Sequence, residues 1–143
     1  MKENIFQKSF TEEFIVHLSD TSCYGMAFYL SYHKWIASTK EKFFIKNVPQ
    51  FTQMFSNEGI KLIVLENYLK IYRELNLHEV VKVNLVCSEI KRIKVKLNYQ
   101  LLNSENLLVA EGYDQIAFVD SFGKPIMLPD KIMFALKKIL VDL

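Results

Sequence analysis

Residues 81–100 read VKVNLVCSEIKRIKVKLNYQ and decide the fold class. In each half of this stretch an apolar side chain returns at every second position. These positions are Val81, Val83, Leu85 and Cys87, then Ile93, Val95, Leu97 and Tyr99. Most residues between them are polar. A period of two predicts two antiparallel strands with one buried face and one largely wet face.

Further strands are expected on both sides of this pair. Residues 60–73 are rich in Ile, Leu, Val and Tyr and predict a strand with a bulge near Glu66 and Asn67. The turn NSEN at 103–106 leads into a long strand over 107–119. Near the N-terminus, residues 14–19 (FIVHLS) predict a short strand.

One long helix is expected between the first strand and the others. Six side chains, all but one of them apolar or aromatic, recur there at steps of three and four, which places them on one helical face. They are Phe28, Tyr32, Trp35, Ile36, Thr39 and Phe43. Pro49 ends this helix, PQFTQMF adds a short extra turn, and residues 129–141 predict a terminal helix. The expected fold is α+β: a curved antiparallel sheet wrapped around one long helix, the hotdog architecture.

Composition narrows the functional classes. The 143 residues suit one domain, expected to span 1–143, and the net charge of +2 does not favour a nucleic-acid binder. Two cysteines and three scattered histidines predict neither a disulfide framework nor a metal site, and we expect no cofactor. With no apolar signal-peptide core and no run of about 20 apolar residues, we expect a cytoplasmic protein without membrane insertion.

Two segments carry a family resemblance. DTSCYGMAFYLSYHKWIASTKEKF at 20–43 is similar to the first active-site segment of the 4-hydroxybenzoyl-CoA thioesterase family, and most similar to the acyl-carrier-protein thioesterases of enediyne and related polyketide pathways. The matching positions are Thr21, Gly25, Phe28, Tyr29, Tyr32, Trp35, Lys40 (Arg in the relatives), Glu41 and Phe43. LLVAEGYDQIAFVDSFGKPIMLPD at 107–130 resembles the final strand of the family, its GKP turn and the Pro that opens the last helix.

The chain departs from the family at one important position. Many members carry an Asp three residues before the Gly, where it acts as nucleophile or general base, and this chain has Ser22 there. The enediyne-type relatives carry Asn at this position, so the change does not exclude activity. Ser22 could orient a water or the substrate carbonyl, or it could simply cap the start of the helix.

The resemblance implies an oxyanion site at the start of the long helix. The donor would be the backbone N–H of Tyr29 beyond the Gly25 turn, although Gly25 could also serve only the turn itself. Asp20 is the nearest carboxylate and the candidate general base, with a solvated turn residue as the alternative. Glu41 is its rival, contributed by the helix of a second subunit.

The same resemblance assigns substrate contacts to Gly25, Phe28, Tyr32 and Lys40. Packing in the core is the alternative for Tyr32, and solvation is the alternative for Lys40. Lys40 follows Tyr29 by 11 residues, or about 16 Å of helix, so it would act at the site of a partner subunit or support the packing near that site.

The expected activity is hydrolysis of acyl-CoA or acyl-carrier-protein thioesters by a bound water, in a homodimer or tetramer. Two alternatives stay open: a non-catalytic module that binds acyl thioesters, and a hotdog dehydratase. Lys91, Arg92, Lys94 and Lys96 could meet CoA phosphates or an acidic carrier protein, or form a solvated face.

Overall fold

The computed structural model describes residues 8–143, which contain one antiparallel sheet. Its strands are β1 (Phe10–Ile15), β2 (Lys61–Ile71), β3 (Val80–Ile90), β4 (Lys94–Leu102) and β5 (Leu108–Val119). They lie in the order β1-β3-β4-β5-β2, so the first two strands of the chain form the two edges. The tight hairpins β3–β4 and β4–β5 account for the centre of the sheet, as the alternating pattern of residues 81–100 predicts.

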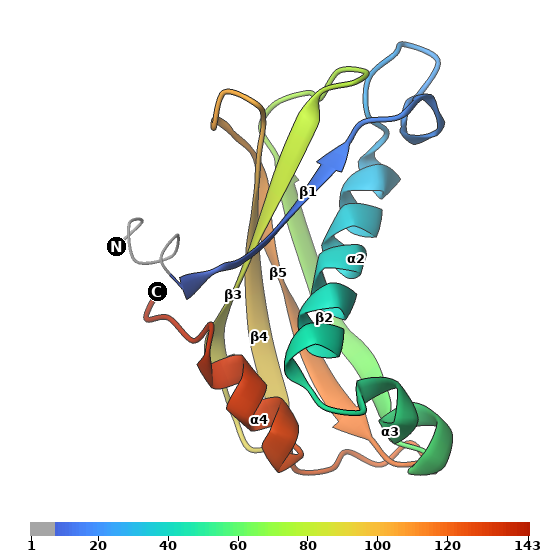
Figure 1. The fold of residues 1–143 in the computed structure, drawn as a ribbon, viewed down its shortest axis with the longest axis vertical. Coiled ribbons are helices and arrows are strands. Elements are labelled where there is room, and N and C mark those ends of the chain that lie inside the picture. The colour runs from blue at the N-terminus through green and yellow to red at the C-terminus, as the bar shows by residue number, and fades with distance from the viewer. Residues whose placement is uncertain (1–7) are drawn as a thin grey trace.

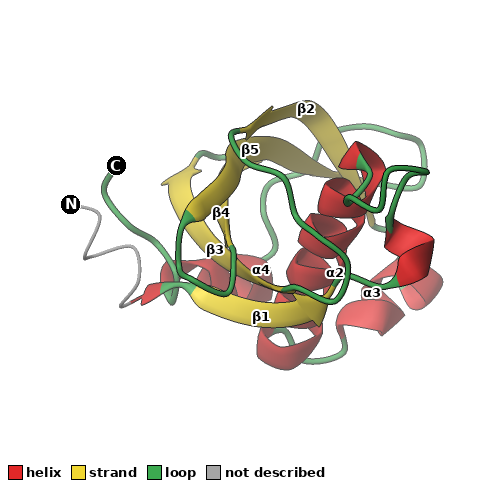
Figure 2. Cartoon of the chain, turned by 90° about the horizontal axis from the view of Figure 1, so that it is seen from above, coloured by secondary structure: helices red, strands yellow, loops and turns green. Residues whose placement is uncertain are grey.

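A long helix, α2 (Tyr29–Asn47), lies in the concave side of the sheet (Figure 1). Seen from above, the sheet curves around α2, with β1 and β2 at the two ends of the arc (Figure 2). A 3-10 turn, η1 (Leu18–Asp20), precedes α2, and the short helix α3 (Phe51–Asn57) follows it. The helix α4 (Asp130–Lys137) packs near the β3 side.

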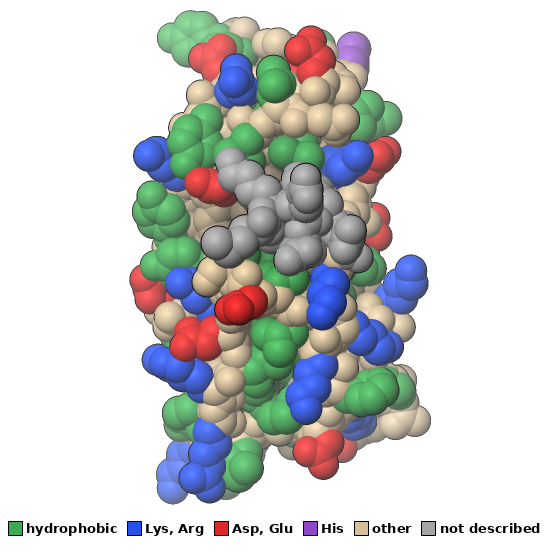
Figure 3. Space-filling model, turned by 90° about the vertical axis from the view of Figure 1, so that its left-hand side faces the viewer, with side chains coloured by type: hydrophobic (Ala, Val, Ile, Leu, Met, Phe, Trp, Pro, Cys, Tyr) green, Lys and Arg blue, Asp and Glu red, His purple; other side chains and the backbone are tan. Residues whose placement is uncertain are grey.

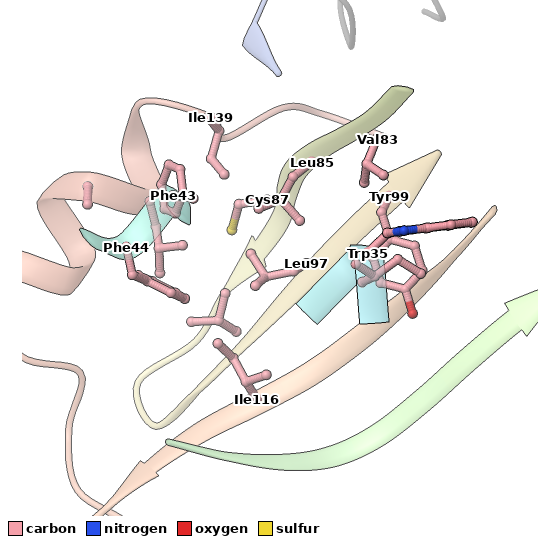
Figure 4. Packing of buried hydrophobic residues seen from close by; sticks show 14 of the residues in the cluster. Trp35, Phe43, Phe44, Val83, Leu85, Cys87, Leu97, Tyr99, Ile116 and Ile139 are labelled. Carbon is pink, nitrogen blue, oxygen red and sulfur yellow. The ribbon is translucent and has the colours of Figure 1, made fainter. Parts of the chain in front are cut away.

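The core lies between α2 and the inner face of the sheet (Figure 4). Val83, Leu85 and Leu97 are fully buried there and point toward the aromatic side chains of α2. Trp35 and Phe43 of α2 are 3% and 1% exposed. Fully burying side chains of this size contributes about 1.5–3 kcal/mol each, so this interface fixes α2 on the sheet.

The edge strand β2 pairs only with β5 among the described residues. Its register shifts between Val64 and Glu66, next to the predicted bulge position. The strand is apolar yet exposed: Val64, Leu65 and Tyr68 are 50%, 54% and 48% exposed. An unpaired edge with large apolar side chains presents free backbone groups and apolar surface to another chain.

Two predicted elements were placed wrongly along the chain. The predicted strand over 14–19 is instead β1 at Phe10–Ile15, followed by η1 at Leu18–Asp20. The predicted terminal helix over 129–141 ends at Lys137. Beyond it, Ile139 and Val141 hydrogen-bond the backbone of Cys87, because the pairing of β1 with β3 stops at Leu85 and leaves that edge free.

The outer face of β3 is less exposed to solvent than the alternation of its residues predicts. Asn84 and Val86 point away from α2, yet each is only 2% exposed. The Asn84 Oδ1 accepts a hydrogen bond from the Thr11 hydroxyl at 2.7 Å, whereas its buried Nδ2 has no hydrogen-bond partner within residues 8–143. The expectation of a largely wet outer face is therefore wrong at the middle of β3.

Candidate active site at the start of helix α2

The segment before α2 forms a small hairpin that ends in a tight turn. Thr21 and Ala27 make an isolated antiparallel bridge, and the Ser22 N–H donates to the Met26 carbonyl at 2.8 Å. Gly25 closes the turn with φ of +77°, a backbone conformation that costs other residues strain. The Gly25 N–H donates to the Ser22 carbonyl at 3.0 Å. Gly25 is thus required by the turn, whatever contact it makes with substrate.

Ser22 belongs to this turn and does not cap the helix. The helix N-cap is Phe28, six residues later, so the capping alternative for Ser22 is wrong. The Ser22 Oγ accepts only a long hydrogen bond from the Tyr24 N–H, at 3.4 Å. Its hydroxyl proton has no acceptor among the described residues, and it remains able to hydrogen-bond a water or a carbonyl oxygen.

The helix start offers a free backbone donor at the predicted position. Tyr29 is the first residue of α2, so its N–H has no acceptor one turn earlier in the helix. The hydrogen bonds of the described residues include none from this N–H. The neighbouring Phe28 N–H, by contrast, is held by the Asp20 carbonyl at 2.8 Å. The positive end of the helix dipole adds to the attraction that the Tyr29 N–H exerts on an oxyanion.

Asp20 is placed beside the helix start, but its carboxylate is already engaged. It is 3% exposed, and its Oδ2 accepts the His17 N–H at 2.9 Å. Its Oδ1 accepts a hydrogen bond from the Lys34 ammonium at 3.3 Å. The Ser31 hydroxyl also donates to the Asp20 carbonyl at 2.8 Å. Asp20 therefore ties η1 to the first turns of α2, and both carboxylate oxygens have partners before any water binds.

The side chain of Asp20 faces the β1 side of α2. It lines a hollow of about 360 Å³ between β1 and α2, together with Phe14, His17, Lys34 and Trp35. The hollow brings His17 close to Asp20, although only the backbone of His17 bonds the carboxylate. The ion pair with Lys34 is weak, because the Lys34 side chain is 71% exposed.

The two aromatic candidates differ in exposure. Phe28 precedes the helix and is 43% exposed, with its ring centroid 4.8 Å from that of Tyr29. The prediction that Phe28 shares the buried face of the helix is therefore wrong, because the helix begins one residue later. Tyr32 is 2% exposed and packs edge-to-face on Trp35. Burial raises the pKa of the Tyr32 hydroxyl above its ordinary value, so it stays a neutral hydrogen-bonding group.

Lys40 is not solvated but belongs to a buried polar network. Its Nζ donates a short hydrogen bond to the Asp114 Oδ2, and the two side chains are 15% and 2% exposed. The Asp114 Oδ1 accepts from the Tyr99 hydroxyl at 3.0 Å and from the Asn67 amide. We call Lys40, Asn67, Tyr99 and Asp114 the Lys40 network; it joins α2, β2, β4 and β5.

Each member of the Lys40 network keeps its partner in place. Burial, followed by the nearby Asp114 charge, raises the pKa of Tyr99 far above its ordinary value, so this hydroxyl remains a donor. The Tyr99 hydroxyl has one proton, so the Tyr68 carbonyl, 3.1 Å from its oxygen, is an alternative acceptor to Asp114; the same oxygen accepts from the Asn67 amide at 3.2 Å. The alternation along β5 carries one signal of this network that sequence reasoning missed: Asp114 is the charged residue among inward positions that otherwise hold Gly112, Ile116 and Phe118.

The remaining candidates stay apart from the helix start. Glu41 is exposed on α2 and makes no ion pair with another described residue. Cys23 is exposed, and burial raises the pKa of the Cys87 thiol to about 11, which leaves it protonated at neutral pH. Within residues 8–143, no three metal-binding side chains come together, and no helix is long and apolar enough to cross a membrane.

The basic residues of the β3–β4 hairpin do not form a uniform positive face. The outer side of the sheet shows Lys and Arg side chains interspersed with acidic and hydrophobic ones (Figure 3). Lys91 is 3.1 Å from the Glu89 carboxylate, and the Lys96 ammonium lies 4.2 Å from the centre of the Tyr113 ring. Docking of an acidic carrier protein at these residues stays a prediction.

Known proteins resemble this chain in structure but not detectably in sequence. No protein-family profile and no curated protein matches the chain by sequence. Among solved structures, the dynemicin thioesterase superposes with a TM-score of 0.87 at 17% identity, covering 94% of this chain and 99% of that one. A mutant 4-hydroxybenzoyl-CoA thioesterase, solved in complex with 4-hydroxybenzoyl-CoA, superposes with a TM-score of 0.81 at 19% identity, covering 90% of this chain and 99% of that one.

The chain has the hotdog fold. This confirms the predicted architecture and its likeness to structures of both thioesterase types named by the sequence resemblance. A hypothetical protein SAV2348 from Staphylococcus aureus, solved in complex with CoA, superposes with a TM-score of 0.85 at 14% identity, covering 94% of this chain and 87% of that one. At such identities the likeness establishes the hotdog domain alone, and the activity must be argued from its own residues.

Proposed function

We propose that this hotdog domain is a thioesterase that hydrolyses acyl-CoA or acyl-carrier-protein thioesters. The observation that carries the proposal is the free N–H of Tyr29 at the exposed start of α2. A thioester carbonyl is already electrophilic, so a donor aimed at the developing oxyanion supplies a large part of the needed catalysis. The solved thioesterases with the same fold support this choice of reaction.

In the proposed reaction a bound water attacks the thioester carbonyl. The Tyr29 N–H stabilises the oxyanion, and the Ser22 hydroxyl helps to orient the water. Collapse of the tetrahedral intermediate breaks the C–S bond, releasing a carboxylic acid and a thiol. Ser22 does not serve as a nucleophile, because no base among the described residues hydrogen-bonds its hydroxyl.

We further propose that the active unit is at least a homodimer, formed along β2. The exposed apolar side chains of β2 and its unpaired edge favour a second copy that pairs antiparallel about a two-fold axis. Light scattering should give a mass of at least twice 16.8 kDa, and Leu65→Lys should lower it. A wild-type protein that stays monomeric at assay concentration would refute the dimer.

A panel of acyl-CoA and acyl-carrier-protein thioesters, read by release of the free thiol, tests the activity. Turnover of a thioester with the rate proportional to enzyme supports a thioesterase. A second candidate function is a non-catalytic acyl-thioester binding module, favoured by Ser22 at the position of the family carboxylate and by the engaged oxygens of Asp20. Tight binding of thioesters without turnover of any of them would establish that alternative.

A further inference from the structure

One end of the molecule brings together two turns and a helix from separate parts of the sequence. The β3–β4 turn lies beside the turn that follows β5, because the first residue of β4 pairs with Ala117 near the end of β5. The Leu128 N–H donates to the Arg92 carbonyl at 3.2 Å, which brings the start of α4 to the same end (Figure 1). We call residues 89–94 and 119–138 the basic end.

The basic end carries a surplus of positive charge. It holds seven Lys and Arg residues against three Asp and Glu residues, which gives a net charge of +4. The whole chain has a net charge of only +2, so the rest of the chain is net negative. On the face drawn in Figure 3, most Lys and Arg side chains lie in the lower half, toward the basic end. This asymmetry favours a partner with a negatively charged surface.

Large apolar side chains project from the same end. Phe122, Met127 and Phe134 are 87%, 60% and 69% exposed, and Ile93 of the β3–β4 turn is 42% exposed. Apolar area that stays in contact with water lowers no free energy, whereas its burial against a partner does. Apolar side chains that are exposed together and surrounded by charged ones therefore indicate an interaction surface.

Hydrogen bonds fix Phe122 at the tip of its turn. The Asp120 Oδ1 accepts the backbone N–H groups of Phe122 and Lys124, both at 2.9 Å. The Asp120 N–H donates to the Lys124 carbonyl at 2.9 Å, and Gly123 between them has φ of +82°. The turn thus presents an aromatic ring and an ammonium group to solvent within three residues.

The outer face of α4 repeats this combination. Phe134, Lys137 and Lys138 are exposed and lie three and four residues apart, so they share one face of the helix. The Lys138 ammonium is 5.5 Å from the centre of the Phe134 ring. The opposite face of α4 is buried against the rest of the protein, so the aromatic and basic side chains are directed outward.

We infer that the basic end is a peripheral docking site for a membrane surface that contains anionic phospholipids. Its Lys and Arg side chains contact the charged headgroups, while Phe122, Met127 and Phe134 reach the boundary between headgroups and acyl chains. A lipid layer accommodates a projecting ring without a preformed hollow, whereas a folded protein must supply a matching pocket. The inference goes beyond the proposed thioesterase function and does not depend on it.

Co-sedimentation with vesicles tests the role of charge. The protein should bind vesicles of phosphatidylcholine with phosphatidylserine at least ~10-fold more tightly than vesicles of phosphatidylcholine alone, and added salt should weaken this binding. One basic residue near an anionic surface raises the affinity about 5-fold, so Lys91→Gln/Lys124→Gln should weaken binding about 30-fold. Lys70→Gln/Arg73→Gln is the matched control, because it removes the same charge at the opposite end of the sheet, and its affinity should stay within ~3-fold of wild type.

Fluorescence tests the apolar contact. The chain has one tryptophan, Trp35, which is only 3% exposed, so Phe122→Trp adds a reporter at the tip of the turn. Its emission should shift to shorter wavelength with phosphatidylserine vesicles and be quenched by lipids brominated in their acyl chains. Leu18→Trp is the control, because Leu18 is 73% exposed beside the start of α2, and its emission should not change. Phe122→Ser should weaken vesicle binding ~10-fold without lowering the melting temperature.

Several results would overturn the inference. They are failure to bind either kind of vesicle, equal affinity for both kinds, equal weakening by the two double variants, and unchanged emission of Phe122→Trp. Binding of an acidic acyl carrier protein in place of vesicles, weakened by Lys91→Gln/Lys124→Gln, would show that the basic end docks a protein and not a membrane. Release of thiol from thioesters is measured separately, so the thioesterase proposal stands or falls on its own result.

Discussion

Removing one backbone N–H at the start of α2 tests the proposed oxyanion site directly. Tyr29 occupies the first helical position, where proline is well tolerated because that N–H has no partner within the helix. The preceding Phe28 has φ of −77° and ψ of 142°, the extended conformation that a residue before proline requires. Tyr29→Pro therefore deletes the donor without breaking a hydrogen bond of the helix.

Tyr29→Ala is the matched control, because it loses the same side chain but keeps the N–H. The Tyr29 ring is 55% exposed and stacks edge-to-face on Phe28, so both variants should lose only ~1 kcal/mol of stability. Their melting temperatures should consequently be similar. Any difference in rate between them then reports on the donor alone.

Loss of one oxyanion donor costs about 100- to 1,000-fold in kcat, or ~2.7–4 kcal/mol of transition-state stabilisation. We expect this loss for Tyr29→Pro relative to Tyr29→Ala, measured by thiol release at saturating thioester. A folded Tyr29→Pro protein with kcat within ~3-fold of Tyr29→Ala would show that this N–H does not stabilise the transition state, and the oxyanion site would have to lie elsewhere.

Three further predictions follow from the geometry. Ser22→Ala should lower the rate only ~10-fold, as expected for a lost positioning hydrogen bond, and an acyl group trapped on the wild-type serine would contradict a bound-water mechanism. Asp20→Asn should lower the rate less than ~10-fold, because both oxygens of Asp20 already serve the local structure. A loss above ~100-fold would instead support the assignment of Asp20 as general base from the sequence. The same loss in Glu41→Gln alone would place the base on the helix of a second copy. Burial raises the pKa of Cys87 to about 11, so the thiol of the unfolded chain ionises first as pH rises. Between pH 8 and pH 11, the free energy of unfolding of wild type, measured in urea, should therefore fall by ~1–2 kcal/mol more than that of Cys87→Ala. Parallel curves for the two proteins would argue against a buried neutral thiol.

The sequence by itself determined the strands and the helix that form the core. Alternation at Val81, Val83 and Leu85 requires one buried face, and the steps from Tyr32 to Trp35 and Thr39 require one buried helical face. Those patterns are local, because they depend only on side-chain direction along one element. They sufficed for the hotdog architecture, whereas the prediction of a donor at the Tyr29 N–H came from the family resemblance.

The ends of elements were harder to locate, because competing local hydrogen bonds decide them. Residues 14–19 look like one strand, but the Asp20 carboxylate accepts the His17 N–H and turns the chain into η1. Likewise Ser22 has the chemistry of a helix cap, yet the turn closed by Gly25 holds it six residues before the cap position. Side-chain preference alone does not distinguish these alternatives.

Only the tertiary structure decided what Lys40 and Asp114 do. They are separated by 74 residues. Lys40 looks like a solvated charge when its own segment is considered, and the alternation along β5 places Asp114 inward without showing which group it meets. Closure of the sheet around α2 removes both from water, and a charge that loses its hydration must find an opposite charge or hydrogen-bonding partners. Asn67 and Tyr99 supply those partners from two other strands, and this requirement appears only when the four elements meet.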